Sequence, residues 1–337
     1  MHNNLSTVFP FKDTDLSESP AITVLRCYRR ADDALKAGIT SLRTVGEQNR
    51  ADLYLKKMIN TGWIRGPRIF AAGKGLGSTG GHGSDFGQVE VDGPEQFERA
   101  AREELSLGVD HLKIFITGGI AKEEEALEEP QMTREEMAAM VSVARDHGTY
   151  VAAHAGGSRA IVVGAEAGVK SFEHAYVLTK EAARAVRGVD GVIVPTLSVT
   201  RSPEWMKENH FEDWTIEKAL SSGTTHLESI RTAVREGVRL LVGTDLPAGD
   251  ESRGVNCTVR EIEYLQDAGS SPLEALRSAT IHCAKLCKAA NELGKLKPNF
   301  LADVIAVPSN PLSDLKALEQ IHFVMKDGMV IRNNLGG

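Results

Sequence analysis

Four ionisable side chains lie within or directly after apolar segments of the chain, where a charged group is costly to bury. They are Lys113, His154, His174 and Asp245. Lys113 interrupts the apolar segment His111–Ile116, and three explanations stay open for this lysine taken alone. It is a surface lysine with a buried stem, a nucleophile that forms a Schiff base, or a metal ligand formed by carboxylation.

The two histidines and the aspartate narrow these alternatives. A single histidine at the end of a strand is more often a hydrogen-bonded core residue than a ligand. His154 and His174, however, end two successive apolar segments. Adjacent parallel strands lie about 4.8 Å apart, which suits two imidazoles that bind one ion. Asp245 follows the apolar segment Arg239–Thr244, at the position of a metal ligand or a general base. Together with Lys113, these residues predict a metal site.

Two further histidines are candidates for the same site. His2 lies at the start of the chain, and His82 lies in the glycine-rich segment Gly75–Asp85. That segment lacks the Lys-Ser/Thr pair of a P-loop, so its glycines equally suit a tight loop that places His82 beside the metal. A phosphate-binding barrel is a weaker alternative, supported only by this segment and by Gly118-Gly119.

These residues need a scaffold that brings strand ends together. Seven apolar segments rich in β-branched residues are each followed by a helical pattern, an alternation typical of parallel strands joined by crossovers. They are Ile39–Val45, Arg68–Gly73, His111–Thr117, Tyr150–Ala155, Ser171–Tyr176, Val192–Leu197 and Arg239–Thr244. Thr133 and Glu136 form a capping box that begins a helix over Thr133–His147.

An eighth strand around Met1–Leu5 would complete an α/β fold of the (β/α)8 TIM barrel type, in which catalytic residues lie at the carboxyl ends of the strands. The alternative, an open doubly wound sheet, is disfavoured because no G-x-G-x-x-G follows the first strand. Near the carboxyl terminus, Ala302–Val307 and His322–Ile331, with a turn at Asp327-Gly328, predict a small β extension.

Composition excludes several classes of function. The chain has 337 residues, a net charge of −7 and 42% hydrophobic residues, so we expect no nucleic-acid partner. No apolar run approaches the roughly 20 residues that span a bilayer, so no membrane partner is expected. Four cysteines lack the spacing of a zinc or redox motif and are expected to be free thiols. The lack of a secretory signal favours the cytoplasm.

The chain resembles the amidohydrolase superfamily, in the branch of imidazolonepropionase-like enzymes and Xaa-Pro dipeptidases (prolidases). The resemblance extends from about Ala21 to Ile331. The matching stretches are Ala37–Thr40 with Arg43, Gly66–Ile69, Thr79–Gly83, Lys113 through Gly119, Ala153–Ala155, Glu173-His174, Gly243–Asp245 and Ala302–Val304. It implies a metal-dependent hydrolase barrel over residues 1–295 and the C-terminal part of a small β-sandwich over residues 296–337.

The resemblance also implies a binuclear site with two divalent ions, zinc being the expected metal. Lys113, as a carbamate, would bridge the ions; His154 and His174 would complete one shell, and Asp245 with His2 the other. A bridging hydroxide would attack the scissile carbonyl of an amide or peptide bond. Asp245 would be the general base and then the general acid, while His82 and Tyr176 would bind the substrate carboxylate or polarise its carbonyl.

The start of the chain departs from the family pattern. His2 aligns with the second histidine of the family's His-x-His motif, and the first histidine and strand one are missing. We expect either a truncated reading of an active enzyme, which we favour, or a barrel in which only the ion held by Lys113, His154 and His174 is intact. A barrel without strand one would expose sheet edges and tend to associate, so a homo-oligomer is expected.

The predicted substrate is a dipeptide or short peptide cleaved near its C-terminal residue, with Xaa-Pro or a basic C-terminal residue as candidates. A dipeptidase, a prolidase and a carboxypeptidase are all compatible with this prediction. The alternatives are a small cyclic amide or an N-acyl amino acid. The non-enzyme alternative is a truncated, catalytically impaired barrel that acts only as a subunit or binding protein.

Overall fold

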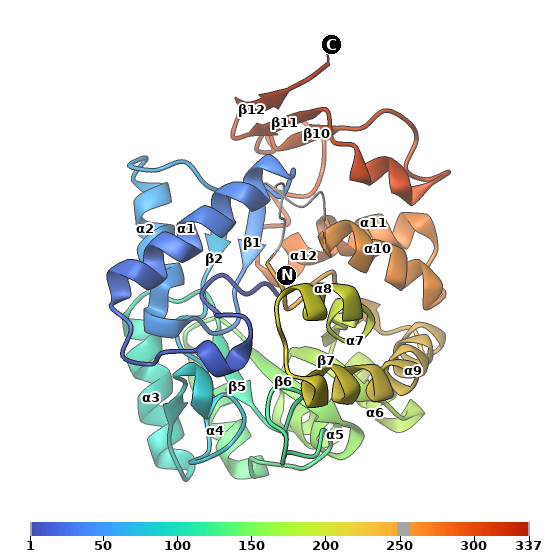
Figure 1. Cartoon of the computed structure of the whole chain (residues 1–337). Coiled ribbons are helices and arrows are strands. Elements are labelled where there is room, and N and C mark those ends of the chain that lie inside the picture. The colour runs from blue at the N-terminus through green and yellow to red at the C-terminus, as the bar shows by residue number, and fades with distance from the viewer. Residues whose placement is uncertain (1, 248–256, 336–337) are drawn as a thin grey trace.

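The computed structural model describes residues 2–247 and 257–335, and its centre is a ring of short parallel strands (Figure 1). Seven strands form one parallel sheet in the order β4-β3-β5-β6-β7-β8-β9, and β1 pairs in parallel with β2. Their bounds are β1 Ser41–Arg43, β2 Arg68–Phe70, β3 Leu76–Gly77, β4 Val89–Glu90, β5 Leu112–Phe115, β6 Val151–Gly157, β7 Ser171–Val177, β8 Val192–Val194 and β9 Arg239–Leu240.

Backbone contacts outside the named strands close the ring. Asn3 bridges to Thr44 in parallel, next to β1. On its other side, the His2 carbonyl accepts hydrogen bonds from the amides of Thr244 and Asp245, each 2.8 Å long. Residues 2–5 therefore occupy the predicted position of the eighth strand, although they form only an isolated bridge. The predicted TIM barrel architecture is confirmed.

Helices surround the ring as the alternating pattern predicts (Figure 1). Their bounds are α1 Pro20–Lys36, α2 Ala51–Asn60, α3 Pro94–Ser106, α4 Arg134–Asp146, α5 Ser158–Ala167, α6 Lys180–Gly188, α7 Leu197–Arg201, α8 Pro203–Glu208, α9 Asp213–Arg235, α10 Cys257–Asp267, α11 Pro272–Ser278 and α12 Ile281–Leu286. The predicted capping box is present at α4, where the Thr133 hydroxyl accepts from the Glu136 amide. None of the helices described is long and apolar enough to cross a membrane.

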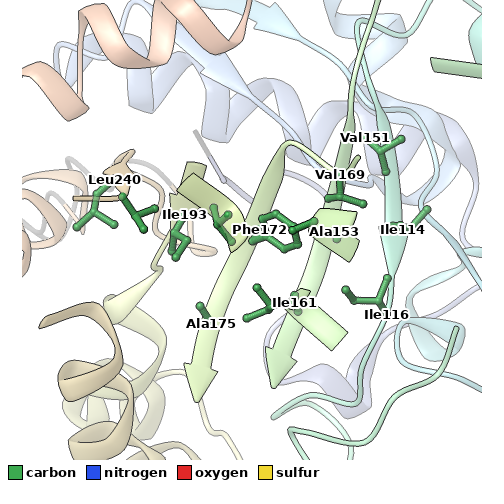
Figure 2. Packing of buried hydrophobic residues seen from close by; sticks show 14 of the residues in the cluster. Ile114, Ile116, Val151, Ala153, Ile161, Val169, Phe172, Ala175, Ile193 and Leu240 are labelled. Carbon is green, nitrogen blue, oxygen red and sulfur yellow. The ribbon is translucent and has the colours of Figure 1, made fainter. Parts of the chain in front are cut away.

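The main hydrophobic core lies between the strands and the helices (Figure 2). Because side chains alternate along a strand, Ile114, Ala153 and Phe172 face the helices. Their neighbours Lys113 and Glu173 face the interior of the ring. Phe172 is fully buried in this layer, and losing a side chain of this kind costs about 3–5 kcal/mol. The packing of this layer fixes the positions of the strands along the barrel axis, and therefore the positions of their polar residues.

Sequence and structure differ mainly in the extent of the strands. Five of the seven predicted strands are shorter than expected, whereas β6 and β7 extend to Gly157 and Val177. The two-residue strands β3 and β4 were not predicted, because each is too short to show alternation. Near the carboxyl terminus, β10 Val304–Ala306, β11 Phe323–Lys326 and β12 Met329–Asn333 form an antiparallel sheet with a turn at Asp327-Gly328, as expected.

Candidate active site

The strand ends hold several non-glycine residues in the left-handed backbone region. His174, Ala175, Thr196 and Asp245 have φ values of 74°, 58°, 54° and 58°. Such residues are uncommon and cluster at functional sites, because the surrounding structure must hold them there. At β7 the left-handed pair interrupts side-chain alternation after Glu173. His174 is thereby available at the upper end of the ring instead of facing the helices.

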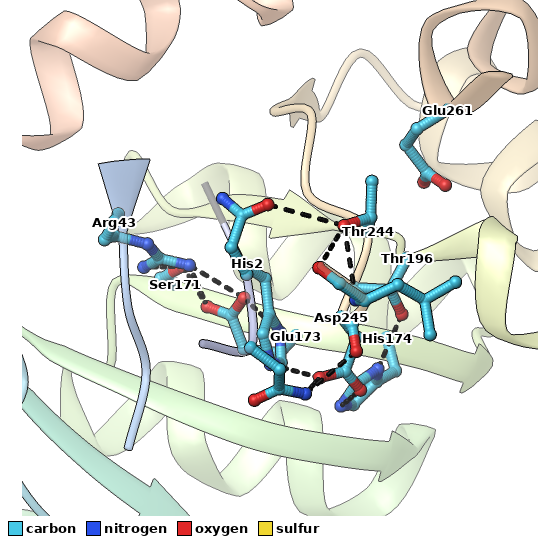
Figure 3. Close-up of polar contacts among 12 residues, drawn as sticks. His2, Arg43, Ser171, Glu173, His174, Thr196, Thr244, Asp245 and Glu261 are labelled. Atoms are coloured by element: carbon cyan, nitrogen blue, oxygen red, sulfur yellow. Dashed lines mark hydrogen bonds and ion pairs between the residues drawn. The ribbon is translucent and has the colours of Figure 1, made fainter. Parts of the chain in front are cut away.

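His2, His174 and Asp245 converge at this end of the ring (Figure 3). One ligand atom from each lies within 4.8 Å of the others. His2 Nε2 is 2.9 Å from Asp245 Oδ1, and His174 Nε2 is 3.9 Å from Asp245 Oδ2. Two imidazole nitrogens and a carboxylate suit a divalent metal such as zinc, so this donor set fits the ion that the sequence predicts.

Each member of this group is held by a further polar contact. The Thr196 hydroxyl lies 2.7 Å from His174 Nδ1, and Asn4 Nδ2 donates to the backbone carbonyl of Asp245 at 2.8 Å. A contact to one imidazole nitrogen orients the ring and directs the other nitrogen toward a metal. His174 Nε2 therefore faces Asp245 with a defined orientation.

Glu173 lies beneath this group and connects it to the barrel interior (Figure 3). Both of its oxygens accept hydrogen bonds from Arg43 Nη2 at 2.7 Å, and Ser171 Oγ donates to it at 2.6 Å. His2 Nδ1 is 3.1 Å from the same carboxylate. Burial would raise the pKa of Glu173, but Arg43 and His2 outweigh it and hold that pKa well below its usual range.

Glu173 was not among the residues predicted for the site. The sequence feature that could have identified it is its position as an acid inside an otherwise apolar strand, directly before the candidate ligand His174. Its partner Arg43 was likewise noted only as part of a matching stretch, although both side chains are fully buried. Only the tertiary structure shows that the two form an ion pair that supports His2.

Lys113 is buried in the ring with 1% of its surface exposed, and Nζ has no hydrogen-bond partner among the described residues. Nζ lies 4.9 Å from the centroid of the Phe115 ring. Burial lowers the pKa of Lys113 to about 8, partly offset by Glu173 and Asp245. This excludes the surface-lysine explanation. A buried amine that is easily neutral is chemically suited to react with CO2 or a carbonyl.

The other titratable groups respond to the same environment. Burial would lower the pKa of His2, but Asp245 and Glu173 outweigh it, so that pKa is raised. Burial lowers the pKa of both His154 and His174, and the Lys113 charge lowers them further. His154 and His174 are thus neutral, as metal ligands must be, and Lys113 lies close enough to affect both.

His154 lies next to the group rather than inside it. Its ring centroid is 4.6 Å from that of His174 and 4.2 Å from that of His82. Its Nε2 lies 2.9 Å from the Gly118 carbonyl. The resemblance implied a shell of His154 with His174, whereas the structure groups His174 with His2 and Asp245. The contact to Gly118 involves one ring nitrogen of His154 and orients the ring.

His82 is fixed by the segment that follows β5. Glu125 Oε2 lies 2.6 Å from His82 Nδ1, and Gln131 Oε1 accepts from the His82 amide at 2.8 Å. The Gly119 amide also donates to Glu125. Lys218 of α9 donates to the carbonyl of Glu125 at 2.7 Å, so α9 holds this segment in place. Glu125 was not a predicted site residue, because nothing distinguishes it from its acidic neighbours in the sequence.

A cavity opens above the group, with about 520 Å³ of empty space including its mouth. Five of the predicted site residues line it: His82, His154, His174, Tyr176 and Asp245. His2 and Lys113 lie outside this lining. Tyr176 is stacked on His174 with ring centroids 5.1 Å apart and an angle of 4° between the planes. Burial raises the pKa of Tyr176 well above its usual value, so its hydroxyl stays protonated and is able to donate a hydrogen bond.

The N-terminal segment that carries His2 is anchored at several points. Glu47 accepts hydrogen bonds from the amides of Leu5 and Ser6 at 3.0 and 2.7 Å. Arg30 Nη1 donates to the carbonyls of Leu5 and Thr7 at 2.9 and 2.6 Å. Glu47 has 2% of its surface exposed. These contacts fix the direction in which His2 enters the ring.

Comparisons with known proteins identify the family of this chain and similar solved structures. Residues 1–331 match the Amidohydrolase family. An ochratoxinase of Aspergillus niger is 28% identical over 94% of this chain and 70% of its own length. A solved Xaa-Pro dipeptidase with bound methionine is 31% identical, with a TM-score of 0.89 over 99% of this chain and 85% of its own. A prolidase complexed with N-methylphosphonate-L-proline is 27% identical, with a TM-score of 0.90 over 98% and 85%.

Proposed function

This chain belongs to the amidohydrolase family and is a hydrolase of carbon–nitrogen bonds, and on that premise we propose that it cleaves the amide bond of a dipeptide or short peptide. The proposal is carried by one observation: His2, His174 and Asp245 converge within 4.8 Å beside a cavity. The methionine and the N-methylphosphonate-L-proline bound in two related structures support a substrate that contains amino acids.

We assign His2, His174 and Asp245 as ligands of one divalent ion, with zinc as the proposed metal. Lys113, as a carbamate, and His154 contribute to a second. The ions would supply a water of lowered pKa and polarise the scissile carbonyl. The partner-free Nζ of Lys113 supports carboxylation, because a carbamate would give this buried nitrogen an anionic group that ligates metal.

Asp245 moves the proton. Its side chain is 23% exposed and borders the cavity, so it reaches both the attacking water and the leaving nitrogen. As the water oxygen bonds to the carbonyl carbon, Asp245 accepts the proton. When the carbon–nitrogen bond breaks, Asp245 returns that proton to the leaving amine. Asn4 holds the Asp245 backbone during both steps.

His82 and Tyr176 bind and orient the substrate. Glu125 holds the imidazole of His82 through Nδ1 and so orients its Nε2 for contact with the carbonyl or carboxylate of the substrate. The protonated Tyr176 hydroxyl donates a second hydrogen bond. Both side chains line the cavity on the same wall as His174.

A panel of dipeptides incubated with zinc-loaded protein tests this proposal. We expect release of free amino acids, about two metal ions per chain by elemental analysis, and loss of activity when a chelator removes them. Absence of turnover on every dipeptide contradicts a dipeptidase. Turnover of cyclic amides or N-acyl amino acids, without turnover of dipeptides, would identify those compounds as the substrates. A metal content near zero would favour a binding protein.

A further inference from the structure

The cavity has a second wall that the proposed chemistry does not use. It is formed by the seven large apolar side chains of the lining: Phe11, Ile120, Val199, Trp205, Met206, Phe211 and Leu246. They come from the N-terminal segment, the segment after β5, the helices α7 and α8, the turn after α8 and the residue after Asp245. We name these seven residues the apolar wall.

Aromatic contacts hold the apolar wall in one arrangement. Trp205 lies with its ring centroid 5.1 Å from Phe9 and 5.5 Å from Phe211. Phe11 meets Phe211 edge-on at 5.1 Å, with an angle of 82° between the planes. Edge-to-face pairs of this kind are favourable beyond the area that they bury. The wall is therefore a preformed surface.

The apolar wall offers no partner to a charged side chain. Among the described residues that line the cavity none is lysine or arginine, and Asp245 is the one acid. Asp245 is already paired with His2. A lysine or glutamate side chain laid on this wall would lose its hydration without compensation, whereas an apolar side chain would be stabilised by its removal from water.

We propose that the apolar wall is a specificity subsite for a large apolar side chain of a residue that flanks the scissile amide, as in methionine, leucine or phenylalanine. This inference rests on the proposed function and makes it narrower. The apolar wall disfavours substrates with a basic residue, which were one of the alternatives in the sequence-based prediction. The N-terminal segment then serves both functions of the site, because it carries His2 as well as Phe11.

Two dipeptide series test the subsite, one varied at the N-terminal and one at the C-terminal residue. Each contains Met, Phe, Gln and Lys, so that Met, Gln and Lys compare side chains of similar length. At one of the two positions we expect kcat/KM for Met and Phe to exceed that for Gln and Lys by at least roughly 30-fold. Equal values at both positions, or preference for Lys, would overturn the subsite while leaving the hydrolase intact.

Binding gives a readout that does not depend on turnover. Trp205 lies in the wall, and the chain has three tryptophans. Free L-phenylalanine and L-methionine should change the tryptophan fluorescence in a saturable way, L-lysine should not, and the Trp205→Phe variant should lose the response. A response without any turnover supports the subsite and counts against the proposed function. Neither response nor turnover counts against both.

A charge substitution gives the sharpest test. Val199 is partly buried in α7, so Val199→Glu places an acid at the wall at low cost to folding. We expect the ratio of kcat/KM for the lysine substrate to that for the methionine substrate to rise roughly fivefold, the effect of one partly exposed charge pair. The matched control is Leu25→Ala on α1, where the side chain is 67% exposed and does not line the cavity. An unchanged ratio in correctly folded Val199→Glu would contradict the subsite.

Discussion

The two walls of the cavity are built in different ways. The polar wall, with His154, His174 and Asp245, stands on strand ends whose backbone is fixed by the barrel and by the core behind it. The apolar wall stands on short helices and connecting segments, where aromatic rings hold one another. The difference separates two functions. The barrel fixes the positions of reacting groups, and the connecting segments select what approaches them.

The two walls also differ in how they satisfy burial. The polar wall places histidines and an acid where burial is costly, and it offsets that cost with partners such as Thr196 and Glu173. The apolar wall needs no partners, because its contacts are dispersion and hydrophobic burial. Substitutions in the polar wall should therefore change the rate of the chemical step, and those in the apolar wall should change the choice of substrate.

The largest effect is expected for Asp245→Asn. The variant keeps the shape of the side chain but loses the proton acceptor and one anionic ligand, so kcat should fall by about a thousandfold or more. The fluorescence response of Trp205 to L-phenylalanine should persist, because the apolar wall is unchanged. If Asp245→Asn retained more than a tenth of the wild-type kcat, the assignment of the chemical step to the polar wall would be contradicted.

Lys113→Ala should reduce the metal content from about two ions to one per chain and lower kcat/KM by about a hundredfold. Elemental analysis of purified variant and wild type measures the first effect. A content of two ions in the variant would contradict a metal-binding role for this lysine. Thermal unfolding of the variant serves as the control for folding.

The pKa of Lys113, lowered to about 8 by burial, gives a pH dependence in metal-stripped protein. CO2 reacts with the neutral amine, and the neutral fraction rises as pH increases through 8, from about a tenth at pH 7 to about nine tenths at pH 9. At the same concentration of dissolved CO2, reactivation with zinc should therefore be roughly tenfold faster at pH 9 than at pH 7. The same rate at both pH values would show that carboxylation of Lys113 does not limit reactivation.

Glu125→Gln tests positioning on the polar wall. Removal of the carboxylate leaves His82 Nδ1 without the partner that orients the ring, so kcat/KM should fall by about tenfold, the lower end of the range for an orienting contact. A purely structural role would lower the stability of the variant without changing its kcat/KM. Lys218→Met, which releases the same segment from α9, is the comparison variant.

The smallest effect is expected for Tyr176→Phe. The ring would still stack on His174, and only the hydroxyl that donates to the substrate is lost. KM should rise by roughly threefold to tenfold, the value of one hydrogen bond of about 0.5–1.5 kcal/mol, with little change in kcat. Steady-state kinetics separate the two constants, and a fall in kcat alone would give Tyr176 a different role.

The sequence predicted much of this fold because its periodic patterns are local. The seven strand segments, the capped helix α4 and the C-terminal sheet were all expected from the sequence. The short strands β3 and β4 were missed, since two residues carry no period. The position of residues 2–5 was expected, but their pairing with Thr44 depends on contacts made far along the chain.

The candidate site divides in a similar way. Residue type and position at a strand end were sufficient to select Lys113, His154, His174 and Asp245 from the sequence, because buried ionisable groups are costly and rare without a purpose. Glu125 and Glu173 were not assigned, because their roles arise from His82 and His2, which are 43 and 171 positions away along the chain.

The sequence by itself determined the class of chemistry, because that depends on which side chains stand at the ends of apolar segments. Only the tertiary structure decided which of them meet, and it placed His174 with His2 and Asp245 through left-handed strand ends that no local pattern indicates. It also decided the apolar wall, whose residues lie far apart along the chain, between positions 11 and 246. The physical reason is that a ligand set and a subsite are defined by distances in space, and folding alone brings distant segments together.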